Sequence, residues 1–171
     1  ARLFGSLTVR ETVMVALDRH LANRDPIAAA LWLPAGKVSE DTALERVDAL
    51  LDLLGLTRYA NHLTGELSTG NRRIVELACI LGQDPAVVVL DEPSAGVAQR
   101  ETEALGPLLR RVQERTGCSM LVIEHDMALL SGLCDELVAM ELGRVITRLG
   151  SCPVMMRSPV AERILARWCG R

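Results

Sequence analysis

Apolar residues recur at helical spacing through the first third of the chain. A Thr-x-x-Glu capping box at residues 8–11 is followed by apolar residues four positions apart, which predicts a helix from Val9 to about Leu21. Residues 22–38 contain two prolines and a glycine and predict a loop with room for one short helix. Ser39 then provides a helix cap, and Gly55 ends the helix that follows. Its apolar stripe consists of Leu44, Val47, Leu51 and Leu54.

Helix-like and strand-like segments alternate from Gly70 onwards, which is typical of a parallel sheet. We expect helices over residues 71–81, 99–116 and 127–134, with Pro107 kinking or delaying the second of them. We expect buried strands over 86–90 and 120–123, a hairpin over 136–149, and a last helix from Pro159 to Trp168. The predicted fold is α/β, with a mostly helical lobe over residues 1–66 and a sheet-containing core over 67–171.

Composition narrows the class of protein. The chain has 171 residues, of which 49% are hydrophobic, so it can bury a substantial core. Its net charge of −3, with scattered positive residues, argues against a nucleic-acid partner. No apolar run approaches the roughly 20 residues of a membrane span. The five cysteines lack metal-like spacing, and we expect them to be reduced thiols of a cytoplasmic protein.

Two polar segments stand out against this apolar background. Asp91 and Glu92 follow an apolar run, and in open α/β sheets ligands bind at the carboxyl ends of such strands. On its own, a carboxylate pair in this place is also compatible with a solvated strand end or a helix cap. Residues 67–73 form a polar turn that opens a helix, where backbone N–H groups suit a phosphate. Gly70 in that turn is equally explained by the tight turn itself.

Together these segments resemble the motifs of ATP-binding cassette (ABC) ATPases. Residues 67–73 (LSTGNRR) resemble the signature motif, and residues 86–93 (AVVVLDEP) resemble the Walker B motif. His125, in the segment IEHDM, resembles the switch histidine of the family. The three segments occur in the order and at the spacing of the family. The resemblance implies a partial P-loop NTPase fold, with a parallel sheet flanked by helices.

The resemblance also implies roles for individual residues, with ATP and Mg²⁺ as cofactors. Asp91 would bind the metal, Glu92 would orient or deprotonate the attacking water, and His125 would contact the γ-phosphate. The signature residues would contact ATP that is bound to a second ABC subunit; these residues are Ser68, Thr69, Gly70 and Asn71.

The chain departs from the family pattern at three positions, and two neighbouring arginines stay unassigned. Thr69 replaces the commoner glycine and Asn71 replaces the usual glutamine. Ala98 replaces a common aspartate just after residues 94–97, which resemble the loop that crosses the dimer interface of the family. Arg72 and Arg73 can equally be a solvated helix face or functional residues.

No P-loop occurs in these 171 residues. The only lysine, Lys37, follows a glycine, but Leu31 stands where the first glycine of that motif should be and Val38 where its hydroxyl residue should be. We therefore expect the chain to be the C-terminal two-thirds of a nucleotide-binding domain, inactive by itself. We also expect an open strand edge at residues 121–123, and therefore self-association by strand pairing or segment exchange, or a rearrangement that fills the gap. If the natural protein began near Ala1, it would instead be a catalytically inactive binding module.

Further features resemble the importers of branched-chain amino acids. These are the long insertion before Ser39, the form of the signature helix, and the segment IEHDM followed by GLCD. The resemblance implies an ATPase subunit at the cytoplasmic face of the cell membrane. Its partners would be a second ABC ATPase subunit, transmembrane permease subunits and a substrate-binding protein, with no nucleic acid. Two alternatives stay open: an ATPase for lipid or lipopolysaccharide export, and an ABC-type protein of DNA repair or translation.

Overall fold

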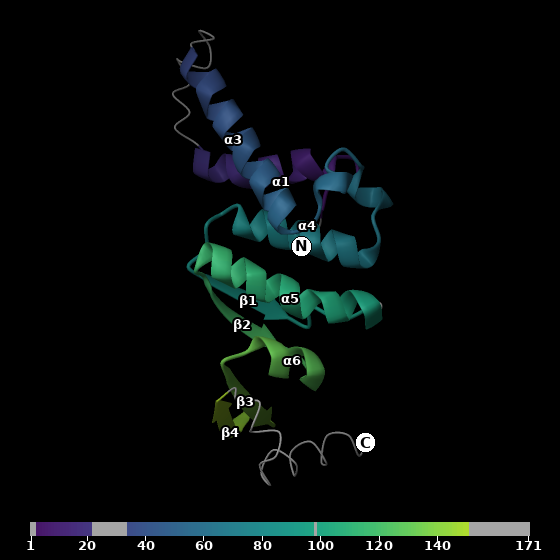
Figure 1. Ribbon diagram of the computed structural model, residues 1–171, viewed down its shortest axis with the longest axis vertical. Coiled ribbons are helices and arrows are strands. Elements are labelled where there is room, and N and C mark those ends of the chain that lie inside the picture. The colour runs from purple at the N-terminus through teal and green to yellow at the C-terminus, as the bar shows by residue number, and fades with distance from the viewer. Residues whose placement is uncertain (1–2, 22–33, 98, 151–171) are drawn as a thin grey trace.

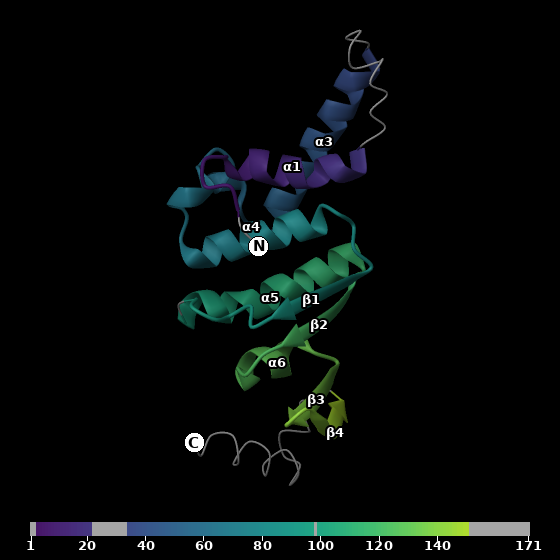
Figure 2. The same cartoon turned by 180° about the vertical axis from the view of Figure 1, so that it is seen from behind.

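A computed structural model describes residues 3–21, 34–97 and 99–150. Its elements are stacked in layers along the long axis of the molecule (Figure 1). Helices α1 (Val9–Leu21) and α3 (Pro34–Leu53) form one end, followed by α4 (Thr69–Leu81) and then by α5 (Gln99–Thr116). Strands β1 (Val87–Asp91) and β2 (Ser119–Ile123) lie beside α5, as the view from behind also shows (Figure 2). The helix predicted over 159–168 lies outside the described residues.

The first helix begins where its capping box predicts. The Thr8 N–H and hydroxyl both donate to Glu11 Oε2 at 2.8 Å, and the Glu11 N–H donates to Thr8 Oγ1 at 3.2 Å. These bonds satisfy N–H groups that a helix start otherwise leaves unpaired. The Thr8 bonds also hold the pKa of the Glu11 carboxyl below its usual value. Val9, Val13 and Leu17 are then buried on one face of the helix.

The second helix begins earlier than the sequence predicts. Helix α3 starts at Pro34 rather than after Ser39, so residues 34–38 are helical and not part of a loop. The rest of the predicted loop, residues 22–33, lies outside the described residues. Proline is well suited to the first helical position, because its missing N–H would have no partner there in any case. Val47 and Leu51 are buried as predicted, but Leu44 is 39% exposed and Ala43 is buried instead. The helix ends before Gly55, whose φ of +70° is the usual left-handed cap.

The second half contains the predicted β-α-β unit. Strands β1 and β2 are parallel neighbours, with Val89 opposite Leu121 and Asp91 opposite Ile123. Helix α5 connects them and continues through Pro107, so the proline does not delay its start. Parallel pairing brings the carboxyl ends of both strands to one edge of the sheet.

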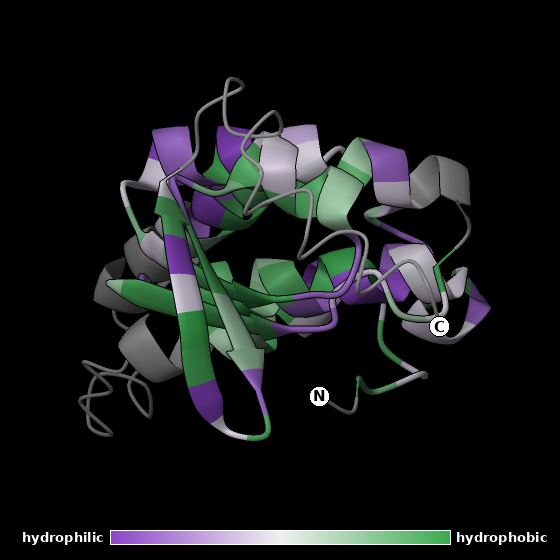
Figure 3. Ribbon diagram, turned by 90° about the horizontal axis from the view of Figure 1, so that it is seen from below, coloured by the Kyte–Doolittle hydropathy of each residue, from purple (hydrophilic) through white to green (hydrophobic). Residues whose placement is uncertain are grey.

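The prediction that both strands are buried is wrong for one face of the sheet. Val87, Val89, Leu121 and Ile123 are each more than half exposed. Their neighbours on the opposite face are covered, Val88 fully and Leu90 partly, because that face packs against the helices. Figure 3 shows the apolar colouring along these two strands. A run of consecutive apolar residues indicates a strand that can be buried on both faces. It does not show whether another element packs against the second face.

One core connects all the layers. It extends from Val9 on α1 through Val47 on α3 and Val75 on α4 to Val88 and Leu109 around the sheet. These side chains are all at least 98% buried, and burying each of them contributes on the order of 1.5–3 kcal/mol. This core therefore fixes the carboxyl ends of β1 and β2 relative to α4, the helix that begins in the signature segment.

The remaining elements follow the sequence closely. Helix α6 (Met127–Leu133) comes after β2, and β3 (Glu136–Glu141) pairs antiparallel with β4 (Arg144–Gly150). Leu142 and Gly143 both have positive φ, as a two-residue hairpin turn requires. The described cysteines are free thiols. Within the described residues, no helix combines the length and apolar character needed to cross a membrane.

Candidate functional site

The signature turn forms the start of helix α4. Ser68 is its N-cap, with an extended backbone and a hydroxyl oxygen that accepts the N–H of Asn71 at 3.2 Å. Gly70 is buried, Asn71 is half-buried, and Ser68 and Thr69 are exposed. The turn therefore presents the positive end of a helix dipole to solvent, which favours an anion.

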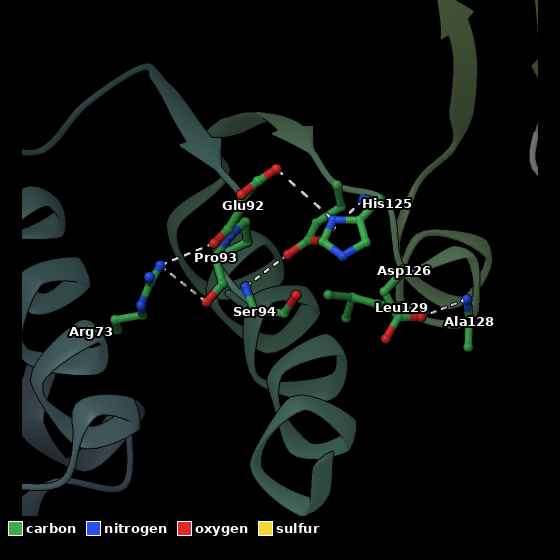
Figure 4. A network of polar contacts seen from close by, with 9 residues as sticks. Arg73, Glu92, Pro93, Ser94, His125, Asp126, Ala128 and Leu129 are labelled. Atoms are coloured by element: carbon green, nitrogen blue, oxygen red, sulfur yellow. Dashed lines mark hydrogen bonds and ion pairs between the residues drawn. The ribbon is translucent and has the colours of Figure 1, made fainter. Parts of the chain in front are cut away.

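The two arginines after the turn do not form a merely solvated face. Arg72 donates to the backbone carbonyls of Leu67 at 3.0 Å and of Gly65 at 3.3 Å, which fixes the segment that leads into the turn. Arg73 donates through Nη1 to the carbonyl of Glu92 at 3.0 Å and to that of Pro93 at 3.5 Å (Figure 4). Arg73 therefore connects the signature helix to the loop after β1.

Asp91 and Glu92 lie at the carboxyl end of β1, as predicted. Both side chains are exposed, and the Glu92 N–H donates to the carbonyl of Ile123 at 2.9 Å. Glu92 has a φ of +45°, which is rare for a residue with a side chain. Such strain costs about 1–3 kcal/mol and is concentrated at functional sites. The turn at Glu92 directs its carboxylate away from the strand and toward His125 (Figure 4).

His125 lies beside Glu92 at the end of the neighbouring strand. Its Nδ1 is 4.0 Å from Glu92 Oε1 and 3.7 Å from Glu124 Oε2. The imidazole is 65% exposed, so it is accessible from solvent and not part of the core. The structure thus brings together the two residues that the sequence predicts to be catalytic.

Glu124 is a structural member of this site that sequence reasoning missed. Its side chain is fully buried, and its carboxylate accepts the Ser94 N–H at 2.7 Å and the His125 N–H at 3.2 Å. Burial alone raises its pKa, but hydrogen bonds from Ser94, His125 and Asp126 outweigh that effect and hold the pKa below its usual value. The sequence feature that could have identified Glu124 is the presence of a carboxylate directly before His125.

Asp126, the residue after His125, caps helix α6. Its Oδ1 accepts the N–H groups of Ala128 at 2.9 Å and Leu129 at 3.1 Å (Figure 4). This cap explains why the chain turns sharply after His125. The histidine is therefore held between the end of a strand and the start of a helix.

The carboxylates suit a magnesium ion. The Asp91 side chain is exposed and has no hydrogen-bond or ion-pair partner among the described residues, so its carboxylate is accessible to a ligand. Mg²⁺ typically uses one or two protein carboxylates and keeps several waters, which matches an exposed Asp91 next to Glu92. No cluster of three possible metal-binding side chains occurs in the described part of the chain.

Comparison with known proteins agrees with these motifs. A family model described as ABC transporter matches residues 1–95, more than half of the chain. BraF of Pseudomonas aeruginosa, a high-affinity branched-chain amino acid transport ATP-binding protein, is 35% identical over 142 residues. LivG of Escherichia coli K12, which has the same description, is 32% identical over 142 residues. Each match covers 83% of this chain and 55% of the relative, so the chain spans little more than half of their length.

A solved structure supports the same fold. CbiO1 from Clostridium perfringens, part of the ABC transporter complex cbiONQ, matches with a TM-score of 0.73 and 27% sequence identity. The match covers 97% of this chain and 59% of cbiO1. The predicted α/β fold of ABC ATPase type is thereby confirmed. Since the family model, the relatives and the fold all agree, the chain belongs to the ABC transporter family.

Proposed function

We propose that this chain is part of the ATP-hydrolysing subunit of a transporter that imports branched-chain or other hydrophobic amino acids. The observation that carries the proposal is Glu92, held at a positive φ at the end of β1 with its carboxylate 4.0 Å from His125. The printed names of BraF and LivG support the choice of substrate.

Asp91, Glu92 and His125 have separate roles in this proposal. Asp91 holds Mg²⁺, which neutralises charge on the phosphates of ATP when it is bound. Glu92 accepts a hydrogen bond from the attacking water and takes its proton, and its exposed carboxylate is accessible for that role. His125 donates a hydrogen bond toward the γ-phosphate, and its position is set by Glu124 and by the cap at Asp126.

The signature turn contributes to the site of a second subunit. Ser68, Thr69, Gly70 and Asn71 face the γ-phosphate of ATP held by that subunit. The exposed Ser68 and the free end of the α4 dipole provide the attraction for the anion. Arg73 then connects that contact to Glu92 within the same chain, because it donates to the Glu92 carbonyl.

The other proposed partners, permease subunits and a substrate-binding protein, follow from the resemblance to ABC importers. The helical lobe, residues 1–66, contacts the transmembrane permease subunits at the cytoplasmic face of the membrane. Arg10 supports the shape of this lobe, since it contacts Asp48 on α3 at 2.7 Å and Asn61 at 3.2 Å. A substrate-binding protein delivers the amino acid on the opposite side.

The test is ATP-dependent uptake by the natural polypeptide that carries this chain, reconstituted with its permease subunits in vesicles. We expect uptake of radiolabelled leucine that disappears in Glu92→Gln and persists in Glu114→Gln, an exposed control on α5. Uptake that is unaffected by Glu92→Gln would contradict the role of Glu92. ATP turnover stimulated by a lipid, without leucine uptake, would instead support the export alternative.

A further inference from the structure

A cavity of about 310 Å³ lies between α4, α5 and the short helix η1 (Thr57–Tyr59). Its wall is apolar where the helices meet the sheet, and the main contributors are Ile74, Leu77, Leu90, Leu105 and Leu109. This volume is at the lower end of the roughly 300–1,000 Å³ that is usual for small-molecule sites.

Two arginines border the same cavity from different elements. Arg58 comes from η1, and its guanidinium carbon lies 4.7 Å from the centre of the Tyr59 ring. A guanidinium that stacks on a ring keeps its N–H groups free at its edge. Arg73 uses Nη1 for the carbonyls of Glu92 and Pro93. Among the described side chains, no carboxylate forms an ion pair with either arginine.

The start of helix α4 adds to this positive border. Gly70 and Asn71, in its first turn, also line the cavity. The cavity therefore combines an apolar wall with two guanidinium groups and the positive end of a helix dipole. A ligand that complements it has one anionic head and an apolar tail.

We propose that this cavity binds a small amphipathic carboxylate, with the carboxylate between Arg58 and Arg73 and the aliphatic chain against α5. Arg–carboxylate pairs provide charge-assisted hydrogen bonds, while the tail removes apolar surface from water. This site does not include the carboxylates at the strand ends. It shares Gly70 and Asn71 with the signature turn, but its binding of a carboxylate does not require the proposed transport function.

Such a ligand would lie next to the loop after β1. Pro93 and Val97 of that loop line the cavity, and Arg73 contacts both the loop and the proposed carboxylate position. Binding is therefore expected to slow amide exchange in the loop as well as in η1 and α5. The segments that become protected from exchange would therefore show where the ligand binds.

Octanoate is the probe for the test, measured by calorimetry and by hydrogen–deuterium exchange on the 171-residue chain. We expect one octanoate per chain, and protection of peptides that contain Arg58, Pro93 or Leu105. Acetate has the head without the tail and octylamine reverses the charge, so neither should bind measurably. Arg58→Gln should weaken binding about tenfold, as loss of a charge-assisted hydrogen bond predicts. Arg144→Gln, an exposed arginine on the hairpin, should leave it unchanged.

A second variant fills the cavity and leaves the charges in place. Leu105→Trp should abolish octanoate binding while the chain keeps its cooperative unfolding transition. The exposed apolar face of β1 and β2 is the competing site, and binding there would protect residues 87–89 and 121–123 instead. That pattern, or affinity unchanged in both Arg58→Gln and Leu105→Trp, would overturn the proposal.

Discussion

Replacement of Glu92 by glycine is expected to stabilise the chain, although it removes a proposed catalytic group. Glu92 adopts a φ of +45°, and a left-handed conformation costs an L-residue about 1–2 kcal/mol. Glycine escapes this cost but loses about 0.5–1 kcal/mol more in backbone entropy on folding. The Glu92 side chain adds little in compensation, since it is 59% exposed and 4.0 Å from His125. We therefore expect Glu92→Gly to raise the free energy of unfolding by about 0.5–1 kcal/mol.

Urea denaturation followed by circular dichroism, at one fixed protein concentration, measures this change as a shift in midpoint with an unchanged slope. Glu92→Ala is the matched control, because it removes the carboxylate and keeps the β-carbon. Because φ is positive at this position, the free energy of unfolding of Glu92→Gly should exceed that of Glu92→Ala by about 1 kcal/mol. At Ala95, where φ is not positive, Ala95→Gly should instead lower stability. If Glu92→Gly proved less stable than Glu92→Ala, the argument from backbone strain would be wrong.

Three other results are expected. Arg73→Ala should lower the free energy of unfolding by about 0.5–1.5 kcal/mol, because it removes a donor from the Pro93 carbonyl and one of two donors from the Glu92 carbonyl, which keeps the Ala95 N–H. Arg115→Ala should cost less than about 0.5 kcal/mol, and equal losses would contradict the contact. Sedimentation should show that the chain self-associates at micromolar concentration and that Leu121→Lys reduces this association. Leu121 is 56% exposed, and among the described residues its strand pairs with β1 alone; a monomer would contradict this prediction. The folded pKa of Glu124 is lowered, so its contribution to stability is present above the unfolded pKa and is lost as pH falls through the folded value. Glu124→Gln should thus lose less stability on acidification, and an unchanged acid profile would refute the assignment.

Elements with local signals could be predicted from the sequence, and those that depend on distant neighbours could not. The start of α1 follows from the Thr8 and Glu11 capping box, whose partners are three residues apart. The hairpin follows from the turn at Leu142 and Gly143. The early start of α3 at Pro34 was missed because Ser39, a few residues later, also has the form of a cap.

The candidate site likewise contains residues that the sequence could identify and contacts that it could not. The motifs located Asp91, Glu92 and His125, because strand ends and their carboxylates are visible in the sequence. Burial of β1 was overestimated, since whether Val87 and Val89 are covered depends on what packs on the second face. The contacts of Arg73 with Glu92, and of Glu124 with Ser94, join residues 19 and 30 positions apart. Only the fold brings such residues together.

The most direct test of the account is ATP turnover in the natural polypeptide that carries this chain, measured as phosphate release at saturating Mg-ATP. We expect Glu92→Gln to abolish turnover while ATP affinity is retained, because an amide cannot take the proton of the attacking water. His125→Ala should likewise reduce the rate far more than the affinity, and the 171-residue chain alone should show no turnover, as it contains no P-loop. Undiminished turnover in Glu92→Gln, or an equal loss of affinity and rate in both variants, would contradict the account.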